Sequence, residues 1–285
     1  MIRILPYYQL LEKQVDIEKV ISDYGKPLHI RDFIDGYYIF TKSGRDAIRM
    51  IMEYERLTRW DEVYITTTTD SPFVSTCVSA TIFNYSKISR VLTENTKMIF
   101  VIHSFGFAHP RIEELRALAT KRNLVLVEDC AFAVDSCNEN GLRLGSLGDY
   151  AIYSLSKILP MKMGGILAFK KRIDYFLHQN DPSIEEEADR LFCLLDFIKK
   201  RRRENYEYLE NKLNFETIYK NTFLTNPFMF GFKTEKYDYI IKKCSQICEF
   251  GRTHVKNEVH IPLNPFIDFK DYDMLIEKIE EIVHA

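Results

Sequence analysis

The chain of 285 residues has no apolar run long enough to cross a membrane, and its first residues lack the apolar segment of a secretory signal. Its net charge is only −2, which gives no electrostatic reason to bind nucleic acid or an anionic membrane surface. No internal repeat or low-complexity linker is present. We therefore expect a soluble, cytoplasmic protein with neither a membrane nor a nucleic acid as its partner.

Cysteine is sparse, with six residues that mostly lie inside apolar runs. This distribution is typical of reduced thiols in the cytosol and does not indicate a disulfide framework. Cys244 and Cys248 lie one helical turn apart, but no second pair completes a zinc site, and the histidines and cysteines of residues 103–137 are not spaced to converge on a metal. No glycine-rich dinucleotide fingerprint follows Leu92. We expect no metal.

Hydrophobic residues make up 46% of the chain, with 20 Phe and 17 Tyr, so a sizeable core is possible. The length exceeds one typical domain. We predict a large cofactor-binding α/β domain with an N-terminal arm over residues 1–180, and a long helix with a small α+β domain over residues 181–285. The long helix spans residues 183–213, and its basic run at residues 199–203 is interpreted as solvated or subunit-facing rather than phosphate-binding. Short strands at 227–232 and helices at 237–248 and 271–283 complete the chain.

The centre of the chain alternates between strand and helix patterns. Residues 97–102 form a continuous apolar run, a helix is predicted from Pro110 to about Asn123, and residues 124–127 form a second apolar run. This order predicts an open, mostly parallel sheet with helices on both faces. Ligands of such sheets bind beyond the carboxyl ends of the strands, where Asp129 is expected to lie.

A helix start at Ser43 is the next informative feature. Ser43 and Asp46 fit a capping box, which predicts a helix to about Tyr54 after a short strand at residues 37–40. The free N–H groups beside a small Ser-Gly pair can bind an anion, usually phosphate. The alternative is simply a well-capped helix.

Two further segments carry candidate ligand contacts. After a strand at residues 60–65, a hydroxyl-rich loop leads to a helix with Pro72 near its first turn, and Phe73 is either a core aromatic or a flat surface for a ring-shaped ligand. A strand is predicted over residues 149–155. Ser154 and Ser156 lie at its end, and Lys157 follows at once. A lysine in that place is either solvated or, when partly desolvated, able to attack a carbonyl carbon.

Pyridoxal 5′-phosphate (PLP) requires these groups together: a lysine for its aldehyde, a carboxylate for its ring nitrogen, an aromatic surface and a phosphate site. The chain resembles the DegT/StrS family of sugar aminotransferases, which have the aspartate-aminotransferase fold. The resemblance covers residues 36–170 best, and its most specific part is the Gly-Ser-Leu-Gly-Asp block at residues 145–149. The other matching segments are Ser43-Gly-Arg-Asp-Ala47, Phe73-Val-Ser-Thr76, residues 96–103 with Gly106, Val127-Glu-Asp-Cys-Ala131 and Ser154-x-x-Lys157 with Gly164-Gly165.

The resemblance implies a role for each matching residue. Lys157 would bind the cofactor covalently and Asp129 would pair with its pyridine nitrogen. Phe73 would stack on its ring. The residues around its phosphate would be Ser43, Gly44, Arg45 and Ser154. The segment before Lys157 is two residues shorter than the family pattern, so Ser156 competes with Ser154 for the phosphate, and Phe132 stands where the family usually has Gln or His.

The activity implied is a PLP-dependent aminotransferase that moves an amino group from a donor such as glutamate onto a keto sugar, nucleotide-linked by analogy, for a surface polysaccharide. The family also implies a homodimer with ligands from both subunits. Two alternatives remain: a PLP-dependent sugar lyase or dehydratase, and a non-catalytic or regulatory relative with a degenerate sugar site.

Overall fold

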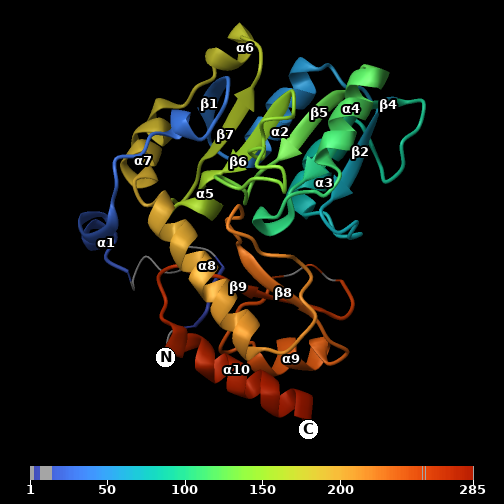
Figure 1. Cartoon of the computed structure of the whole chain (residues 1–285). Coiled ribbons are helices and arrows are strands. Elements are labelled where there is room, and N and C mark those ends of the chain that lie inside the picture. The colour runs from blue at the N-terminus through green and yellow to red at the C-terminus, as the bar shows by residue number, and fades with distance from the viewer. Residues whose placement is uncertain (1–2, 7–14, 252, 254, 285) are drawn as a thin grey trace.

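A computed structural model describes residues 3–6, 15–251, 253 and 255–284. The first part of the chain forms a seven-stranded sheet flanked by helices, and the last part forms a two-stranded sheet with helices of its own (Figure 1). The predicted α/β class, with a mostly parallel sheet and a small α+β region at the C-terminal end, is confirmed. No helix in the described ranges is both long and apolar enough to span a membrane.

The large sheet has the strand order β1-β7-β6-β5-β4-β2-β3. The five strands from β6 to β3 run parallel, whereas β7 is antiparallel to both of its neighbours, β6 and β1. The strands are β1 (Tyr37–Thr41), β2 (Glu62–Thr67), β3 (Lys87–Ser89), β4 (Thr96–Ile102), β5 (Val125–Asp129), β6 (Tyr150–Ser154) and β7 (Gly165–Phe169).

Both faces of the sheet are covered, which explains the continuous apolar run in β4. Met98 and Phe100 pack on one side with α2 (Gly44–Tyr54), α3 (Thr76–Phe83) and α6 (Asp174–Leu177). Ile99 and Val101 pack on the other side with α4 (Ile112–Arg122). The predicted strand–helix–strand unit is therefore present, and Asn123 ends its helix in the left-handed conformation that asparagine tolerates.

The helix start at Ser43 forms as predicted. Ser43 is the N-cap of α2, and its Oγ accepts the N–H of Asp46 at 3.3 Å while donating to the Asp46 carboxylate at 2.6 Å. Gly165 on β7 packs directly beneath this turn, because a Cβ there would lie 2.7 Å from the backbone nitrogen of Gly44. A glycine at position 165 is therefore a packing requirement of the helix start.

The predicted long helix over residues 183–213 is two helices, α7 (Pro182–Phe192) and α8 (Leu195–Lys212). The break lies at Cys193, whose carbonyl accepts the N–H of Lys26 at 3.0 Å instead of continuing the helical ladder. Lys26 follows α1 (Ile17–Tyr24) in the N-terminal arm. The arm therefore interrupts the helix, and no local signal in residues 183–213 announces it.

The C-terminal elements are β8 (Met229–Lys233), α9 (Tyr237–Cys244), β9 (Glu258–Pro262) and α10 (Phe269–His284). They share a hydrophobic cluster with the second half of α8, which runs from the large sheet to the small one (Figure 1). The first half of α8 packs with α7 against the large sheet. The predicted domain boundary at residue 181 stays a prediction. Strand β9 was not predicted, and α3 begins at Thr76 rather than near Pro72.

Candidate active site

A cavity of about 420 Å³ lies at the carboxyl ends of the parallel strands. Thr67 ends β2, Ile102 ends β4 and Asp129 ends β5, and all three line it. Lys157 reaches it from α5 (Leu155–Ile158), the single turn that follows β6. The strand-end location predicted for the site therefore holds for the candidate carboxylate and the candidate lysine together.

Asp129 presents a buried carboxylate to this cavity, with only 5% of the residue exposed. One oxygen, Oδ1, accepts the N–H of Ala131 at 3.0 Å, and no described group donates to Oδ2. Burial raises the pKa of this carboxyl, and the nearby positive charge of Lys157 opposes that shift. A buried acceptor that faces a cavity and still has an open oxygen is suited to a ligand that donates a hydrogen bond.

Lys157 is partly buried, and desolvation lowers the pKa of its ammonium, although the Asp129 carboxylate opposes this shift. Its Nζ lies 4.1 Å from the centroid of the Phe132 ring. The carbonyl of Lys157 accepts a hydrogen bond of 3.0 Å from the Arg202 guanidinium. A lowered pKa leaves more of the amine free to attack a carbonyl carbon at neutral pH.

Arg202 corrects the interpretation of the basic run at residues 199–203 as solvated. Only 1% of Arg202 is exposed, and it lies on the apolar stripe of α8 between Ile198 and Tyr206. That spacing of four residues is a helical repeat, so the periodicity of the sequence contained the signal. Lys199 in the same run pairs with Asp135 at 2.7 Å.

Aromatic side chains make up much of the remaining cavity wall. Phe73, in the loop before α3, lines it as predicted for a ring contact. Phe105 also lines it, with φ of 54°, a left-handed conformation that is strained for a bulky residue. No sequence signal identified Phe105, because nothing in its neighbours requires this conformation.

The four residues predicted to bind phosphate lie outside the cavity wall, on the N-terminal side of α2 and at the end of β6. Gly44 and Ser154 are neighbours, since a Cβ on Gly44 would lie 3.9 Å from the Cβ of Ser154. Ser43 caps the helix, and Arg45 is exposed. The structure thus brings part of this set together, and its role at a phosphate stays a prediction, as does the choice between Ser154 and Ser156.

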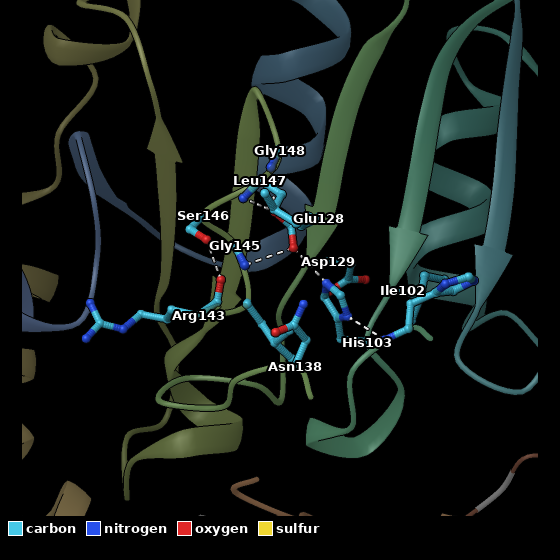
Figure 2. A network of polar contacts seen from close by, with 12 residues as sticks. Ile102, His103, Glu128, Asp129, Asn138, Arg143, Gly145, Ser146, Leu147 and Gly148 are labelled. Carbon is cyan, nitrogen blue, oxygen red and sulfur yellow. Dashed lines mark hydrogen bonds and ion pairs between the residues drawn. The ribbon is translucent and has the colours of Figure 1, made fainter. Parts of the chain in front are cut away.

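Glu128, next to Asp129, is fully buried and belongs to a polar network beside the cavity (Figure 2). His103 Nδ1 accepts the N–H of His109 at 3.0 Å, so its Nε2 carries the proton and donates to Glu128 at 2.9 Å. Burial alone would raise the pKa of Glu128, but these hydrogen bonds hold it below its usual value. Three backbone N–H groups also donate to Glu128, those of Gly145, Leu147 and Gly148.

This network explains the Gly-Ser-Leu-Gly-Asp block that made the resemblance specific. Its last residue, Asp149, accepts the N–H of Leu126 at 2.8 Å and pairs with Arg116 at 3.0 Å. The block therefore wraps the buried Glu128 carboxylate and fastens β6 to β5. Its contacts support the strand that carries Asp129, whereas Asp129 and Lys157 face the cavity themselves.

The C-terminal elements complete the cavity with residues that the sequence did not identify. Tyr219, Glu249 and Glu258 line it, and burial raises the pKa of Glu258. Behind them lies His260, which is fully buried, with the Tyr219 hydroxyl 3.5 Å from its Nε2. These residues are distant in sequence from Lys157 and reach the cavity only through the packing of β8 and β9.

His260 predicts a pH dependence of stability. Burial lowers its pKa to about 4, whereas an unfolded histidine has a pKa of about 6.5. As the pH falls through this window, the unfolded chain binds a proton that the folded chain does not, so stability is present above about pH 6.5 and is lost toward pH 4. Replacing His260 with Gln should lower the slope of unfolding free energy against pH by about 1 kcal/mol per unit.

Urea unfolding at a series of pH values measures this slope. The exposed His178 provides the matched control, and His178→Gln should leave the slope unchanged. A His260→Gln protein with the slope of the unmodified chain would show that His260 titrates normally in the folded state. His109, whose pKa burial also lowers to about 4, contributes dependence of the same sign in this pH window.

The cavity supplies three of the four groups that the implied cofactor requires, whereas the residues predicted to bind its phosphate lie outside the cavity wall. A PLP site needs an amine, a buried carboxylate with an open acceptor oxygen and a flat apolar wall. Lys157, Asp129 and Phe73 supply these groups around one cavity. Its volume lies in the range of about 300–1,000 Å³ that is usual for small-molecule sites.

Residues 30–172 match the model of the DegT/DnrJ/EryC1/StrS aminotransferase family. A GDP-perosamine synthase of Vibrio cholerae is 28% identical over 140 residues, covering 44% of this chain and 38% of that protein. A dTDP-3-amino-3,6-dideoxy-alpha-D-galactopyranose transaminase of Aneurinibacillus thermoaerophilus is 32% identical over 131 residues, covering 41% and 36%. The matched region thus spans less than two fifths of either relative.

Among solved structures, the fold is similar to that of a candidate sugar aminotransferase, Spr1654 from Streptococcus pneumoniae, in its PMP form. The TM-score is 0.76, and the match covers 99% of this chain and 98% of that one. The two sequences are 14% identical, so this likeness concerns the fold alone. It extends the agreement beyond residue 172 into the C-terminal elements.

Proposed function

Because this chain belongs to the DegT/DnrJ/EryC1/StrS aminotransferase family, we propose that it is a PLP-dependent aminotransferase acting on a keto sugar. The observation that carries this proposal is the pair formed by Lys157 and Asp129 on one cavity, an amine of lowered pKa beside a buried carboxylate. When bound, PLP supplies an aldehyde that takes up amino groups and a ring that accepts electrons.

Different residues are proposed to bind different parts of the cofactor. Lys157 Nζ would bind the aldehyde carbon, and Asp129 Oδ2 would accept the hydrogen bond of the ring nitrogen. Phe73 would cover the ring. Ser43, Gly44, Arg45 and Ser154 are proposed for the phosphate, with the helix N-terminus of α2 supplying N–H groups.

Lys157 would also act as an acid–base group. Once it no longer bonds the cofactor, its amine can take a proton from the Cα of the amino donor and deliver it to C4′, the aldehyde carbon of the cofactor. The lowered pKa of Lys157 helps, because only the neutral amine accepts a proton.

The acceptor is proposed to be a keto sugar, nucleotide-linked, in the synthesis of a surface polysaccharide. Support comes from the two relatives described above, whose names refer to sugars carried on GDP and dTDP. A further relative from Salmonella typhimurium, 35% identical over 79 residues and matching 28% of this chain and 18% of its own length, is named a lipopolysaccharide biosynthesis protein. The amino donor is proposed to be an amino acid such as glutamate.

Glutamate alone tests the reaction. Mixing the PLP-loaded protein with L-glutamate, without any sugar, should replace the absorbance near about 420 nm with absorbance near about 330 nm, because the amino group moves to the cofactor. 2-Oxoglutarate should appear in equal amount. Stopped-flow absorbance and quantitation of the keto acid measure both.

The same experiment separates the alternatives. A PLP-dependent lyase or dehydratase would bind PLP yet form no 2-oxoglutarate from glutamate. A non-catalytic relative with a degenerate site would give no absorbance near about 420 nm when PLP is added. D-Glutamate is the matched control, since a site that orients the α-proton toward Lys157 should discriminate the enantiomers.

The protein is further proposed to be a cytoplasmic homodimer. Support for the dimer comes from exposed aromatic side chains on the large part of the molecule, among them Trp60 at 80% and Phe83 at 58% exposure. Light scattering after size exclusion should give about twice the chain mass of 33.7 kDa at micromolar concentration. A mass equal to one chain would contradict a site shared between subunits.

A further inference from the structure

The ammonium of Lys157 has an aromatic neighbour in place of a hydrogen-bond partner. Its Nζ lies 4.1 Å from the centroid of Phe132, well within the range of a cation–π interaction, and it donates no hydrogen bond to any described residue. The charge is stabilised more by a ring face when it is partly desolvated, as Lys157 is. Phe132 is therefore the direct contact of the lysine in its unbonded state.

Phe132 is held in place by a second aromatic ring. Its centroid lies 4.5 Å from that of Phe228, at an interplanar angle of 45°. Phe228 is 2% exposed, and its N–H donates to the carbonyl of Phe105 at 2.8 Å. Phe105 also packs on Phe132, with centroids 5.5 Å apart. The ring beneath the lysine is thus fixed from two directions.

The contacts then return to the lysine through Arg202. The guanidinium carbon of Arg202 lies 4.8 Å from the centroid of Phe228, and its Nη2 donates to the carbonyl of Lys157 at 3.0 Å. These contacts form a closed circuit. The Lys157 ammonium lies over the ring of Phe132, which packs on the ring of Phe228. The Arg202 guanidinium lies over Phe228 and donates a hydrogen bond to the Lys157 backbone.

We propose that Phe132, Phe228 and Arg202 form a seat that positions the free ammonium of Lys157 at the cavity whenever this lysine is not bonded to the cofactor. The side chain is fixed by the ring of Phe132 and the backbone by Arg202, so the lysine is held at both ends. The role of this seat in catalysis rests on the proposed function. The contact itself exists in the chain without cofactor, so it can be tested separately.

The seat also gives a reason for Phe132, which stands where the resembling family usually has Gln or His. A ring face favours the charged lysine without offering a group that could hydrogen-bond to it or titrate. Other titratable groups lie near the lysine: Asp129 and Cys77 act on it electrostatically, and Asp129, Tyr219, Glu249 and Glu258 line the same cavity. A test must therefore weaken the ring and leave these groups untouched.

Fluorination achieves this, because it weakens the negative face of the ring and nearly preserves its shape. The variant is Phe132→3,4,5-trifluorophenylalanine in the full chain stripped of cofactor. Trace acetylation with acetic anhydride, followed by peptide mass spectrometry at a series of pH values, gives the protonation midpoint of Lys157. We expect that midpoint to fall by about one pH unit.

Two controls make the result specific. The exposed Lys171, measured in the same digests, should keep its midpoint, and so should Lys157 when the fully buried Phe230 is fluorinated instead. Arg202→Met removes the backbone end of the seat but also a nearby positive charge, which by itself raises the Lys157 midpoint, so only a fall in the midpoint would support this end of the seat. If Arg202→Met does not fold, the fluorinated variants still decide the question.

A Lys157 midpoint that does not change on fluorination of Phe132, in a protein with normal circular dichroism, would overturn the proposal. Failure of the proposed function looks different, since the unmodified protein would then gain no absorbance near about 420 nm with PLP. That outcome would leave the labelling result intact. The two ideas can therefore fail independently.

Discussion

Replacing Lys157 with alanine is expected to abolish both the absorbance near about 420 nm that PLP gives when it bonds a lysine and the amino transfer itself. The amine of Lys157 is proposed to bind the cofactor and then to move the proton, so one substitution removes two functions. Loss of a group that acts in both ways should lower the rate by at least about a thousandfold. Absorbance spectra and single-turnover kinetics with glutamate measure these effects.

The fold should survive this substitution. Lys157 donates no hydrogen bond to a described residue and carries a partly buried charge, so removing it leaves no donor or acceptor unpaired. Asp129, whose pKa is already raised by burial, would become protonated more readily without the opposing ammonium. Lys171→Ala is the matched control and should keep the spectrum. Survival of the yellow species in the Lys157→Ala protein would make the lysine assignment wrong.

Much of the large sheet was predictable because its strands are buried on both faces. The runs of β4 and β5 are apolar at successive positions and therefore lack the helical spacing of polar and apolar residues. Asp46 marks the start of α2 through its bond to the N-cap Ser43, and Asn123 marks the end of α4 because it tolerates the left-handed conformation. Parallel strands end at one edge of a sheet, so Asp129 and Lys157 could be expected to meet there. That expectation required only strand order and direction.

The rest of the site depends on contacts between distant segments, which a local pattern does not encode. Glu258 lies on β9, which pairs with β8, and it lines the cavity together with residues of the large sheet. At the break between α7 and α8, the Cys193 carbonyl accepts a hydrogen bond from Lys26, which is far along the chain. Residues 249 and 258 carry no local sign that they approach residue 157.

Arg202 is a different case, because the sequence did contain a signal that its side chain is buried. A run of five basic residues resembles a solvated surface, yet Ile198, Arg202 and Tyr206 follow one another at helical spacing on the buried stripe. The Gly-Ser-Leu-Gly-Asp block illustrates the converse: it identified the family, but its hydrogen bonds go to Glu128 and the backbone rather than into the cavity.

Replacing Asp129 with asparagine should separate cofactor binding from catalysis. The amine of Lys157 remains, so the absorbance near about 420 nm should persist. An amide carries no charge, and the ring nitrogen would lose the charge-assisted hydrogen bond that keeps it protonated. If that bond contributes about 3–5 kcal/mol in a water-poor site, the rate of amino transfer should fall by about 10²- to 10⁴-fold.

Asp149→Asn is the control. It removes the charge of an aspartate just before β6, the strand that neighbours β5. Asp149 accepts the N–H of Leu126 and pairs with Arg116, so its replacement should lower the unfolding free energy but leave the rate per folded molecule unchanged. Asp129→Asn should show the opposite pattern, because its carboxylate accepts a single described hydrogen bond. A full rate in the Asp129→Asn protein would mean that the ring nitrogen is not paired with this carboxylate. In that case Lys157 would be the only residue of the pair with a role at the cofactor.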